Sequence, residues 1–233
     1  MPSMTKLSKG AVKMYKIETH LHTAESSPCA KLDAAEMIRL YHASGYKTVI
    51  VTDHFLQKYL DRYDPESWKN AVDRFFLGYK NAKEEGDRIG VNVIASAEIH
   101  LSNVPGDYLT YGITPEMLYQ HPDICKLTHK EFYSIMHENG VLVVQAHPRR
   151  DGGTYTDYAC IDGFEIINSN PRHENYDALV AAQAKEHNLY VTAGSDAHRF
   201  DDYGLSGMIS DTEIKTMDEF IGFVKSGRGQ LIK

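Results

Sequence analysis

Cysteine is scarce in this chain, and its few cysteines are poorly placed for disulfides or for a thiolate metal site. Only three occur among 233 residues, Cys29, Cys125 and Cys160, at unrelated spacings. The odd number does not fit a small domain built on disulfides, and the lack of a Cys-x-x-Cys pair disfavours a zinc site made of thiolates. We therefore expect reduced thiols in a cytoplasmic protein.

Long apolar runs and excess positive charge are also missing. No run reaches about 18 apolar residues, so no membrane-spanning helix is expected. Residues 1–13 lack the apolar core of a secretory signal. The formal net charge is −7 at neutral pH, which disfavours nonspecific binding to nucleic acid or to an anionic membrane. Nothing in the sequence indicates an oligomeric state.

What the chain does contain is an alternation of short apolar runs with helical patterns. Seven runs rich in Val, Ile and Tyr predict strands that are buried on both faces, at residues 14–20, 48–52, 91–97, 107–112, 141–146, 163–168 and 190–194. Helical patterns lie between and after them at residues 32–44, from 64 onward, 130–139, 171–187 and 216–226. Thr128 and Glu131 form a capping box before the third of these helices. This alternation predicts parallel strands with right-handed crossovers.

Histidines and acids gather at the ends of these apolar runs. The groups are Glu18-Thr-His20-Leu-His22, Thr52-Asp53-His54, Ala97-Glu98-Ile-His100, Ala146-His147-Pro148 and Ser195-Asp196-Ala-His198. Because side chains alternate along a strand, His20 and His22 point to the same side, as do Asp196 and His198. Imidazoles and carboxylates brought to one rim by several strands predict an active site that holds more than one metal.

The order of these groups is more specific than any one of them. The chain has His-x-His after the first strand, Thr-Asp-His after the second, a lone Glu after the third, His-Pro after the fifth and Gly-Ser-Asp-Ala-His after the seventh. From about residue 16 to about residue 204, this series resembles the PHP (polymerase and histidinol phosphatase) family of metal-dependent phosphoesterases. Amidohydrolase barrels also begin with His-x-His, but they are longer and usually carry a bridging Lys, which no strand end here provides.

The resemblance implies an α/β fold of the PHP type, a distorted seven-stranded (β/α)7 barrel. We expect one PHP domain over residues 1–233. Residues 1–13 would form a short flexible extension, residues 14–204 the barrel with the metal site, and residues 205–233 a C-terminal helix and tail.

The resemblance also implies two or three divalent metal ions, and the mixed nitrogen and oxygen ligands admit Zn, Mn and Fe. The first ion would be held by His20, His22, Glu98 and Asp196. Glu98 would bridge to a second ion, held also by His147 and by Asp107, at a position where the family often has His. The third ion would be held by His54 and His198, with Glu25 as the choice for its remaining ligand. Asp53 is expected to orient a histidine rather than to bind metal.

The activity implied by the resemblance is hydrolysis of a small-molecule phosphate monoester by metal-activated hydroxide, with Glu98, Asp196 and His198 as catalytic groups. The residues expected to bind the phosphate or the substrate are Arg149, Arg172, Arg199 and His100. Arg150 also follows a predicted strand end, and one or two of the four arginines could clamp the phosphate. Asn168 is expected as a polar group at the rim of the site. Two alternatives stay open: a phosphodiesterase or nuclease acting on nucleotides or short nucleic acid, and a metal-binding domain without catalysis. A long basic groove would favour the nuclease, and a closed pocket would favour the monoesterase.

Overall fold

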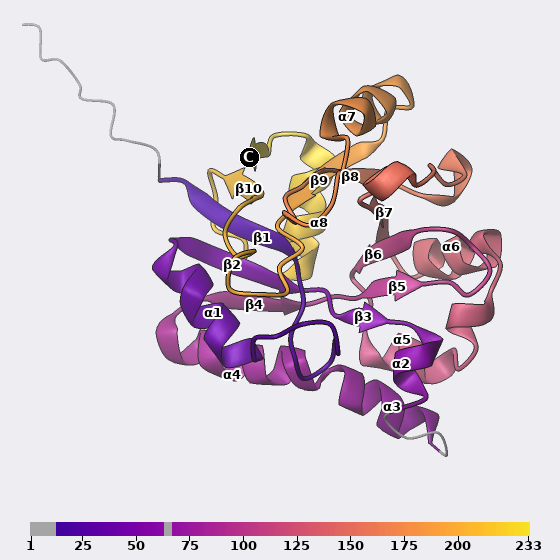
Figure 1. Ribbon diagram of the computed structural model, residues 1–233, viewed down its shortest axis with the longest axis horizontal. Coiled ribbons are helices and arrows are strands. Elements are labelled where there is room, and N and C mark those ends of the chain that lie inside the picture. Colours follow the sequence, from indigo (N-terminus) through magenta and orange to yellow (C-terminus); the bar gives the residue numbers. More distant parts are fainter. Residues whose placement is uncertain (1–12, 63–66) are drawn as a thin grey trace, which may run out of the picture.

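The computed structural model describes residues 13–62 and 67–233, whose strands form two sheets (Figure 1). The first sheet has the order β11-β10-β1-β2-β4, with β1 at Tyr15–Leu21, β2 at Tyr46–Val51, β4 at Asn92–Ala95, β10 at Gly207–Ser210 and β11 at Gln230–Ile232. The second has the order β3-β5-β6-β7-β8-β9, with β3 at His54–Phe55, β5 at Glu98–His100, β6 at Asp107–Tyr111, β7 at Leu142–Ala146, β8 at Gly163–Asn168 and β9 at Tyr190–Gly194. A strand is present in each of the seven predicted runs, while β3, β5, β10 and β11 were not predicted.

The two sheets are joined where the chain passes from one to the other. Residues 52–53 connect β2 to β3, and residues 96–97 connect β4 to β5. A single parallel bridge between Leu21 and Ala197 links β1 to the segment after β9. Among the described residues the strands therefore form two mixed sheets, and the predicted distorted (β/α)7 barrel is not confirmed.

The prediction that all strands are parallel is wrong for β6. This strand runs antiparallel to both β5 and β7, and Asp107 lies opposite His100 on one side and Ala146 on the other. Because β6 is reversed, its first residue lies at the same edge as the last residues of β5 and β7. The reversal therefore brings Asp107 beside the end of β7, next to His147 and within reach of the Glu98 side chain.

The helices cover the outer faces of the sheets. They are α1 Ala34–Ala43, α2 Gln57–Leu60, α3 Trp68–Phe75, α4 Leu77–Ile89, α5 Pro115–Gln120, α6 His129–Glu138, α7 Asp177–Glu186 and α8 Met217–Ser226. Figure 1 shows α1 and α4 side by side below the first sheet and α7 beside β8 and β9. Short 3-10 helices lie at Ile124–Lys126, Arg150–Gly152 and Tyr158–Cys160.

Helix starts follow the capping chemistry of the sequence. The capping box of Thr128 and Glu131 is confirmed at the start of α6, and Thr216 caps α8 in the same way. The helix predicted from residue 64 begins outside the described residues, and its described part starts after Ser67. The helix predicted from residue 171 begins only at Asp177, because asparagine side chains hold residues 168–175 in a loop.

The interior is filled by apolar side chains from both sheets. Phe55, Phe132 and Phe164 are fully buried within one cluster of the core, and Tyr111 packs against Phe220 of α8 within another. The C-terminal segment, expected to be a helix and tail, also adds β10 and β11 to the first sheet. None of the described helices has both the length and the apolar character needed to cross a bilayer.

Candidate metal centre

His20 and His22 lie side by side at the end of β1 and are fully buried. Their Nε2 atoms are 3.1 Å apart. Two carboxylates face the same atoms: Asp196 Oδ1 is 3.1 Å from His22 Nε2, and Glu98 Oε2 is 3.4 Å from it. Strand alternation and the bridge between Leu21 and Ala197 produce this arrangement, because they place the end of β1 beside the segment that carries Asp196.

Glu98 is shared with a second group of side chains at the edge of β6 and β7. His147 Nε2 lies 2.9 Å from Glu98 Oε1 and 3.9 Å from Asp107 Oδ2. Ligand atoms of these three residues all lie within 4.8 Å of one another. The two carboxylate oxygens of Glu98 therefore face different groups, as a bridging carboxylate requires.

A third group is formed by His22, His54 and His198. The ring of His22 stacks on that of His54, with centroids 4.1 Å apart, and lies 4.2 Å from that of His198. His54 Nδ1 is 2.7 Å from Glu98 Oε2. His198 Nδ1 lies 2.9 Å from the backbone oxygen of Asp196, which can only accept, so Nδ1 carries the proton and Nε2 is left as the ligand atom.

The surroundings of Glu98 Oε2 indicate whether these residues fit a metal cluster. Glu98 Oε2 is buried and accepts no hydrogen bond among the described residues, although His20, His22 and His54 each bring a ring nitrogen within 3.5 Å of it. A buried carboxylate oxygen without a donor is costly and rare. Nitrogen and oxygen atoms packed this closely are the ligands that divalent transition metals prefer. The residues therefore fit a bound cluster of such ions.

The electrostatics of His22, Glu98 and Asp196 match that role, whereas nearby carboxylates raise the pKa of His20 against the effect of burial. Burial, together with the neighbouring His54 and His198, holds the pKa of His22 well below its usual range, so its imidazole is neutral. Burial alone would raise the pKa of Glu98, but His54 and His20 outweigh it and hold this pKa well below the usual range. Asp196 is held ionised in the same way, by His20 and Arg150. Neutral imidazole and ionised carboxylate are the forms that bind metal.

Glu165 is the main site residue that the sequence interpretation missed. Its Oε1 lies 2.8 Å from His20 Nδ1, and its Oε2 accepts a hydrogen bond of 3.0 Å from the backbone N–H of His147. A carboxylate on the far nitrogen fixes the ring of a metal-binding histidine and its tautomer. The signal in the sequence was a single acid inside the apolar run at residues 163–168.

Asp53 reaches the cluster through a serine. Its Oδ1 accepts a hydrogen bond of 2.6 Å from Ser27 Oγ, and Ser27 Oγ lies 3.4 Å from His22 Nδ1. The same carboxylate accepts from the backbone N–H and the hydroxyl of Thr23. Asp53 thus holds the loop after β1 against the histidines.

Glu25 does not join the cluster, so the expectation that it binds metal is wrong. Its carboxylate accepts hydrogen bonds from the backbone N–H of Ala34 and from Asn81 Nδ2. An acid at a helix N-terminus satisfies otherwise unpaired N–H groups, and this use turns Glu25 toward α1. The loop instead brings Cys29 to His54 and His198. Burial alone would raise the pKa of the Cys29 thiol, but hydrogen bonds with His198 and His54 lower it to about 6.

A cavity of about 280 Å³ opens beside the cluster, and arginines form part of its wall. Arg150, Arg172 and Arg199 line it together with His54, Asp107, His147 and His198. Arg150 is paired with Asp196 and also donates to Asn168 Oδ1 at 2.9 Å. Arg172 is held by Asp202 at 2.5 Å. This wall is the part of the site that is suited to an anion.

Arg149 and His100 lie differently from their expected places. The guanidinium of Arg149 stacks over the Tyr155 ring at 5.6 Å and is not part of this wall, so its role in phosphate binding stays a prediction. Arg150, the next residue, faces the cavity instead. His100 Nδ1 lies 2.8 Å from Asp107 Oδ1, so His100 contacts the rim of the cluster but not the cavity wall.

The backbone is strained where two of these residues leave their strands. His147 has φ +32° and Asp196 has φ +51°, values in the left-handed region that residues other than glycine rarely adopt. Such strain persists only where the surroundings hold it in place, and it gathers at functional sites. Here the hydrogen bonds of Glu165 and Asn170 hold the two turns.

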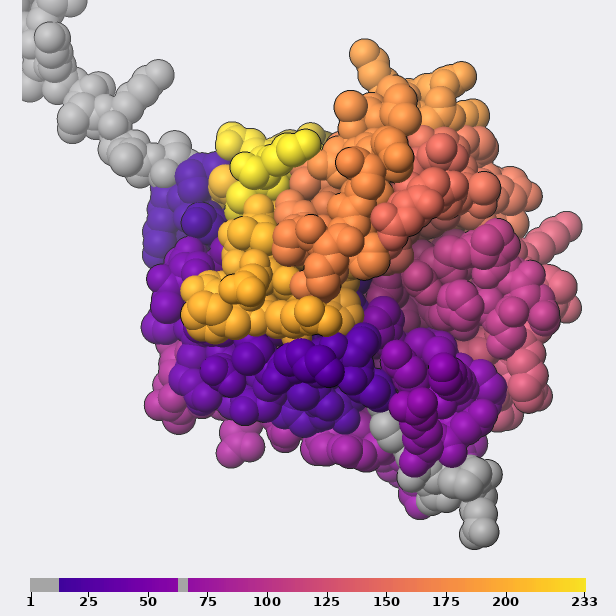
Figure 2. Space-filling view, viewed as in Figure 1, coloured from indigo at the N-terminus to yellow at the C-terminus, as the bar shows by residue number. Residues whose placement is uncertain are grey.

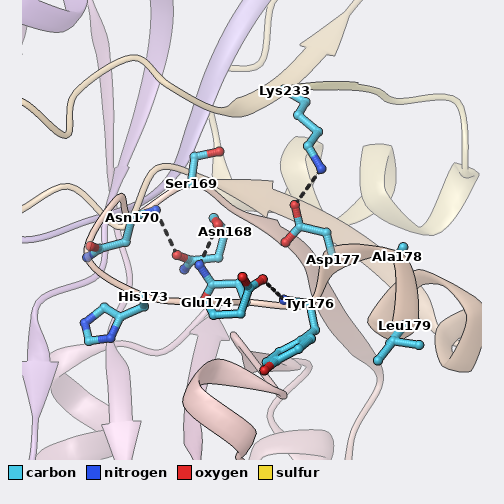
Figure 3. Close-up of a pocket in the computed structure, with 11 residues that line it drawn as sticks. Asn168, Ser169, Asn170, His173, Glu174, Tyr176, Asp177, Ala178, Leu179 and Lys233 are labelled. Atoms are coloured by element: carbon cyan, nitrogen blue, oxygen red, sulfur yellow. Dashed lines mark hydrogen bonds and ion pairs between the residues drawn. The ribbon is translucent and has the colours of Figure 1, made fainter.

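A second cavity of about 460 Å³ adjoins the first and shares Asn170 and His173 with it (Figure 3). Figure 3 shows Asn168 beside Asn170, with Lys233 paired to Asp177 at the far side. Asn168, expected as a polar rim group, lines this second cavity. Polar side chains surround most of it, and Tyr176 and Leu179 are exposed at its mouth.

Known proteins resemble this chain at the level of fold. A family model described as PHP-associated matches residues 174–228, the segment that contains Asp196 and His198. No protein of curated function matches the sequence. A two-domain protein from Bacteroides vulgatus, containing a predicted PHP-like metal-dependent phosphoesterase, superposes with a TM-score of 0.70 at 14% identity over 94% of this chain. The chain spans 64% of the length of that protein.

Two further structures share the fold at lower similarity. A proposed metal-dependent phosphoesterase from Bifidobacterium adolescentis has a TM-score of 0.56 at 15% identity, covering 91% of this chain and 95% of its own. An amidohydrolase from Chromobacterium violaceum, with bound sulfate and no metal, has a TM-score of 0.56 at 16% identity, covering 81% and 90%. A PHP-associated family model thus matches the C-terminal part of this chain, and the fold of the chain is shared with a protein that contains a predicted PHP-like phosphoesterase.

Proposed function

We propose that this protein is a metal-dependent phosphoesterase that hydrolyses small-molecule phosphate monoesters. The observation that carries the proposal is a buried cluster of imidazoles and carboxylates whose open side is a cavity walled by arginines. The relatives named as metal-dependent phosphoesterases agree with it at the level of the fold.

In this proposal the cluster holds two or three divalent ions. The first would be bound by His20, His22, Glu98 and Asp196, the second by Glu98, Asp107 and His147, and the third by His54 and His198. When bound, such ions lower the pKa of a water molecule and neutralise charge on a phosphoryl group. The protein contributes ligands that are already held in place by their neighbours, so little reorganisation is needed before reaction.

The arginines would bind the phosphate. Arg150 is fixed by Asp196 and by the amide oxygens of Asn168 and Asn175, so its guanidinium is oriented before substrate arrives. Arg172 and Arg199 lie on the same wall. A rigid guanidinium suits the planar pairs of phosphate oxygens better than a lysine would.

The size and charge of the site favour a small monoester. The cavity beside the cluster, of about 280 Å³, suits one phosphate with a small group attached, and the polar neighbouring cavity would take the alcohol part. The formal net charge of −7 opposes binding of a long polyanion. The experiment must distinguish this activity from the alternative, which is hydrolysis of phosphodiesters or short nucleic acid.

The test compares a monoester with a diester on the same protein. Loaded with Mn, Zn or Fe, the protein should hydrolyse p-nitrophenyl phosphate at least about tenfold more efficiently than bis(p-nitrophenyl) phosphate, and chelation should abolish both activities. The double variant His20→Ala/His22→Ala should lose the activity. The double variant His42→Ala/His137→Ala is the matched control, because both of its histidines are exposed on helices. Activity retained without His20 and His22 would sink the proposal, and a preference for the diester would replace it with the phosphodiesterase.

Amide hydrolysis is a second candidate, because the Chromobacterium violaceum protein with this fold is named an amidohydrolase. The arginine wall favours the phosphoesterase, since an uncharged amide has no use for several guanidinium groups. Inhibition by inorganic phosphate separates the two. A phosphoesterase should be inhibited competitively, and Arg150→Met should weaken this inhibition at least about tenfold, as expected for the loss of a charge-assisted pair. Arg149→Met should leave it unchanged.

A further inference from the structure

The loop between β1 and α1 is folded back onto the metal centre. Its backbone turns at Ser27, where the N–H of Ala30 donates to the Ser27 carbonyl oxygen at 2.9 Å. The N–H of Lys31 then donates to the carbonyl oxygen of His198 at 2.8 Å. Figure 2 shows the orange segment around residue 200 lying against the indigo loop near residue 30. The position of Cys29 is thus set by hydrogen bonds on both sides of it.

Cys29 faces the cluster from this loop. It lines the same cavity as His54, His198 and Tyr59. The thiol is free and only partly buried, whereas Cys125 and Cys160 are buried elsewhere in the structure. Two histidines that can ligate metal and one free thiol therefore meet at one wall.

The third group of ligands is short of an anionic ligand of its own. The carboxylate of Glu98 is already shared between the other two groups, and Glu25 is turned toward α1. His54 Nδ1 nonetheless lies 2.7 Å from Glu98 Oε2, the buried oxygen that accepts no hydrogen bond. An ion beside His54 and His198 would satisfy these atoms. Cys29 lines the same cavity as these two histidines, and its sulfur could add a negative ligand that the other two groups do not use.

We propose that Cys29 Sγ is the remaining protein ligand of the ion held by His54 and His198, in the place expected for Glu25. The inference rests on the metal-dependent function proposed above. It changes the chemistry of that site from nitrogen and oxygen alone to a site with one thiolate. Sulfur favours Zn, Co or Fe over the harder Mn and Mg. A site with three protein ligands also leaves room for a water or substrate oxygen, as catalytic zinc sites do.

Cobalt reports this ligand directly, because a thiolate bound to Co²⁺ gives a sulfur-to-cobalt charge-transfer band in the near ultraviolet. Histidine and carboxylate ligands give only the weaker visible bands. We expect the cobalt-loaded full chain to show the charge-transfer band. Cys29→Ala should lose the band and bind one cobalt ion fewer or at least about tenfold more weakly, as expected when one ligand is lost. Cys160→Ala is the matched control and should keep both the band and the stoichiometry.

A second measurement protects the result against a variant that fails to fold. In the wild-type protein, bound zinc should slow alkylation of Cys29 by iodoacetamide, read peptide by peptide by mass spectrometry. Cys29→Ser, which keeps nearly the same shape, should also lack the charge-transfer band while retaining the visible bands of the remaining ions.

The outcomes separate this inference from the proposed function. Visible cobalt bands without the charge-transfer band in wild type, or a band that survives in Cys29→Ala, would overturn the role of Cys29 and leave the phosphoesterase standing. A band that depends on Cys29 in a protein without phosphatase activity would support the ligand and overturn only the proposed reaction. Failure of the full chain to bind cobalt at all would overturn both.

Discussion

Glu165 lies fully buried in β8, and its two carboxylate oxygens hold different parts of the site. One contacts His20 Nδ1 at 2.8 Å, and the other accepts from the backbone N–H of His147 at 3.0 Å. Asn168 also donates to it, at 2.8 Å. One side chain thus sets the orientation of two histidines that belong to different groups of ligands.

Replacing this carboxylate tests whether metal binding depends on the group that orients the histidines as well as on the histidines themselves. Glu165→Gln removes the negative charge. It also places an amide N–H₂ group opposite one of the groups that donate to the carboxylate in wild type. We expect metal affinity to fall about 10- to 100-fold, the usual cost of losing a group that orients a ligand. Competition with a fluorescent chelator measures it. Glu84→Gln, at an exposed position of α4, should leave affinity unchanged. An equal effect of both changes would refute the role of Glu165.

Single residues also show how far the sequence could be interpreted. The side chains at strand ends were predictable, because a strand fixes which side each residue faces and His20, His22, Glu98 and Asp196 all follow apolar runs. Residues in loops were not. Glu25 and Cys29 lie on one loop, and only its folded path shows that the acid caps a helix while the thiol reaches the histidines. Arg149 and Arg150 are adjacent, and a turn of the backbone decides which one faces the cavity.

At the scale of elements, β1 and β9 must approach closely for the cluster to form. Gly194, the last residue of β9, allows this, because a Cβ there would lie 2.5 Å from His20 Cβ and 2.9 Å from Glu165 Oε1. The glycine is thus required by the contact between strands, since its φ is not in the left-handed region.

Gly194→Ala should therefore force the two strands apart. We expect the free energy of unfolding to fall by about 1–3 kcal/mol, the usual cost of overpacking, with weaker metal binding. Gly222→Ala is the matched control in the interior of α8, where an added Cβ meets no atom within 4 Å. That change should stabilise the protein by about 0.5–1 kcal/mol, because alanine favours helix. Urea denaturation measures both, and tolerance of Gly194→Ala with unchanged metal affinity would contradict the close packing.

The contact between α1 and α4 has a carboxylate at its centre. Glu85 receives hydrogen bonds from Arg88 at 2.6 Å and from Arg39 of α1 at 3.2 Å. The hydrogen bond from Arg88 is the largest influence and, with Arg39, lowers the pKa of Glu85 from 4.5 to about 2 against the opposing effect of burial. A lowered folded-state pKa stabilises the fold above the unfolded value, and this stabilisation is lost as the pH falls from about 4.5 to about 2.

Glu85→Gln should thus destabilise the protein at neutral pH, but progressively less as the pH falls from about 4.5 toward about 2. Chemical denaturation measures the difference in the free energy of unfolding between the variant and wild type at each pH. The titration of the metal centre is the same in both proteins, so it cancels from this difference. Asp87→Asn, which breaks the exposed pair with Lys83, should change stability by less than about 1 kcal/mol. A difference between wild type and Glu85→Gln that does not vary with pH would show that the carboxylate charge has no part in the contact.

The positions of the strands were predicted better than their directions and their pairing. Each of the seven apolar runs contains a strand, because continuous burial leaves a strong sequence signal. The reversal of β6 and the short strands β3 and β5 could not be predicted, since direction and pairing depend on how distant segments meet. The division into two sheets has the same origin, because residues 52–53 and 96–97 leave one sheet and enter the other within two residues.

For the molecule as a whole, the metal centre lies where the two sheets meet. The ligands His20 and His22 come from the first sheet, and Glu98, Asp107 and His147 come from the second. Ions that bind between the sheets would bind the folded state and not the unfolded state. An ion whose free concentration is 100 times its dissociation constant would raise the free energy of unfolding by about 2.7 kcal/mol. Metal binding is therefore expected to hold the sheets together as well as to supply the chemistry.

The most direct measurement of the central claim is an anomalous difference map from crystals of the metal-loaded protein, recorded at the absorption edge of the bound element. The account predicts one peak among His20, His22, Glu98 and Asp196, a second among Glu98, Asp107 and His147, and a third beside His54, His198 and Cys29. Peaks about 2.0–2.2 Å from the nitrogen and oxygen ligands, and about 2.3 Å from the Cys29 sulfur, would confirm it. A loaded crystal with no peak within reach of His20 and His22, or with its metal elsewhere, would contradict it.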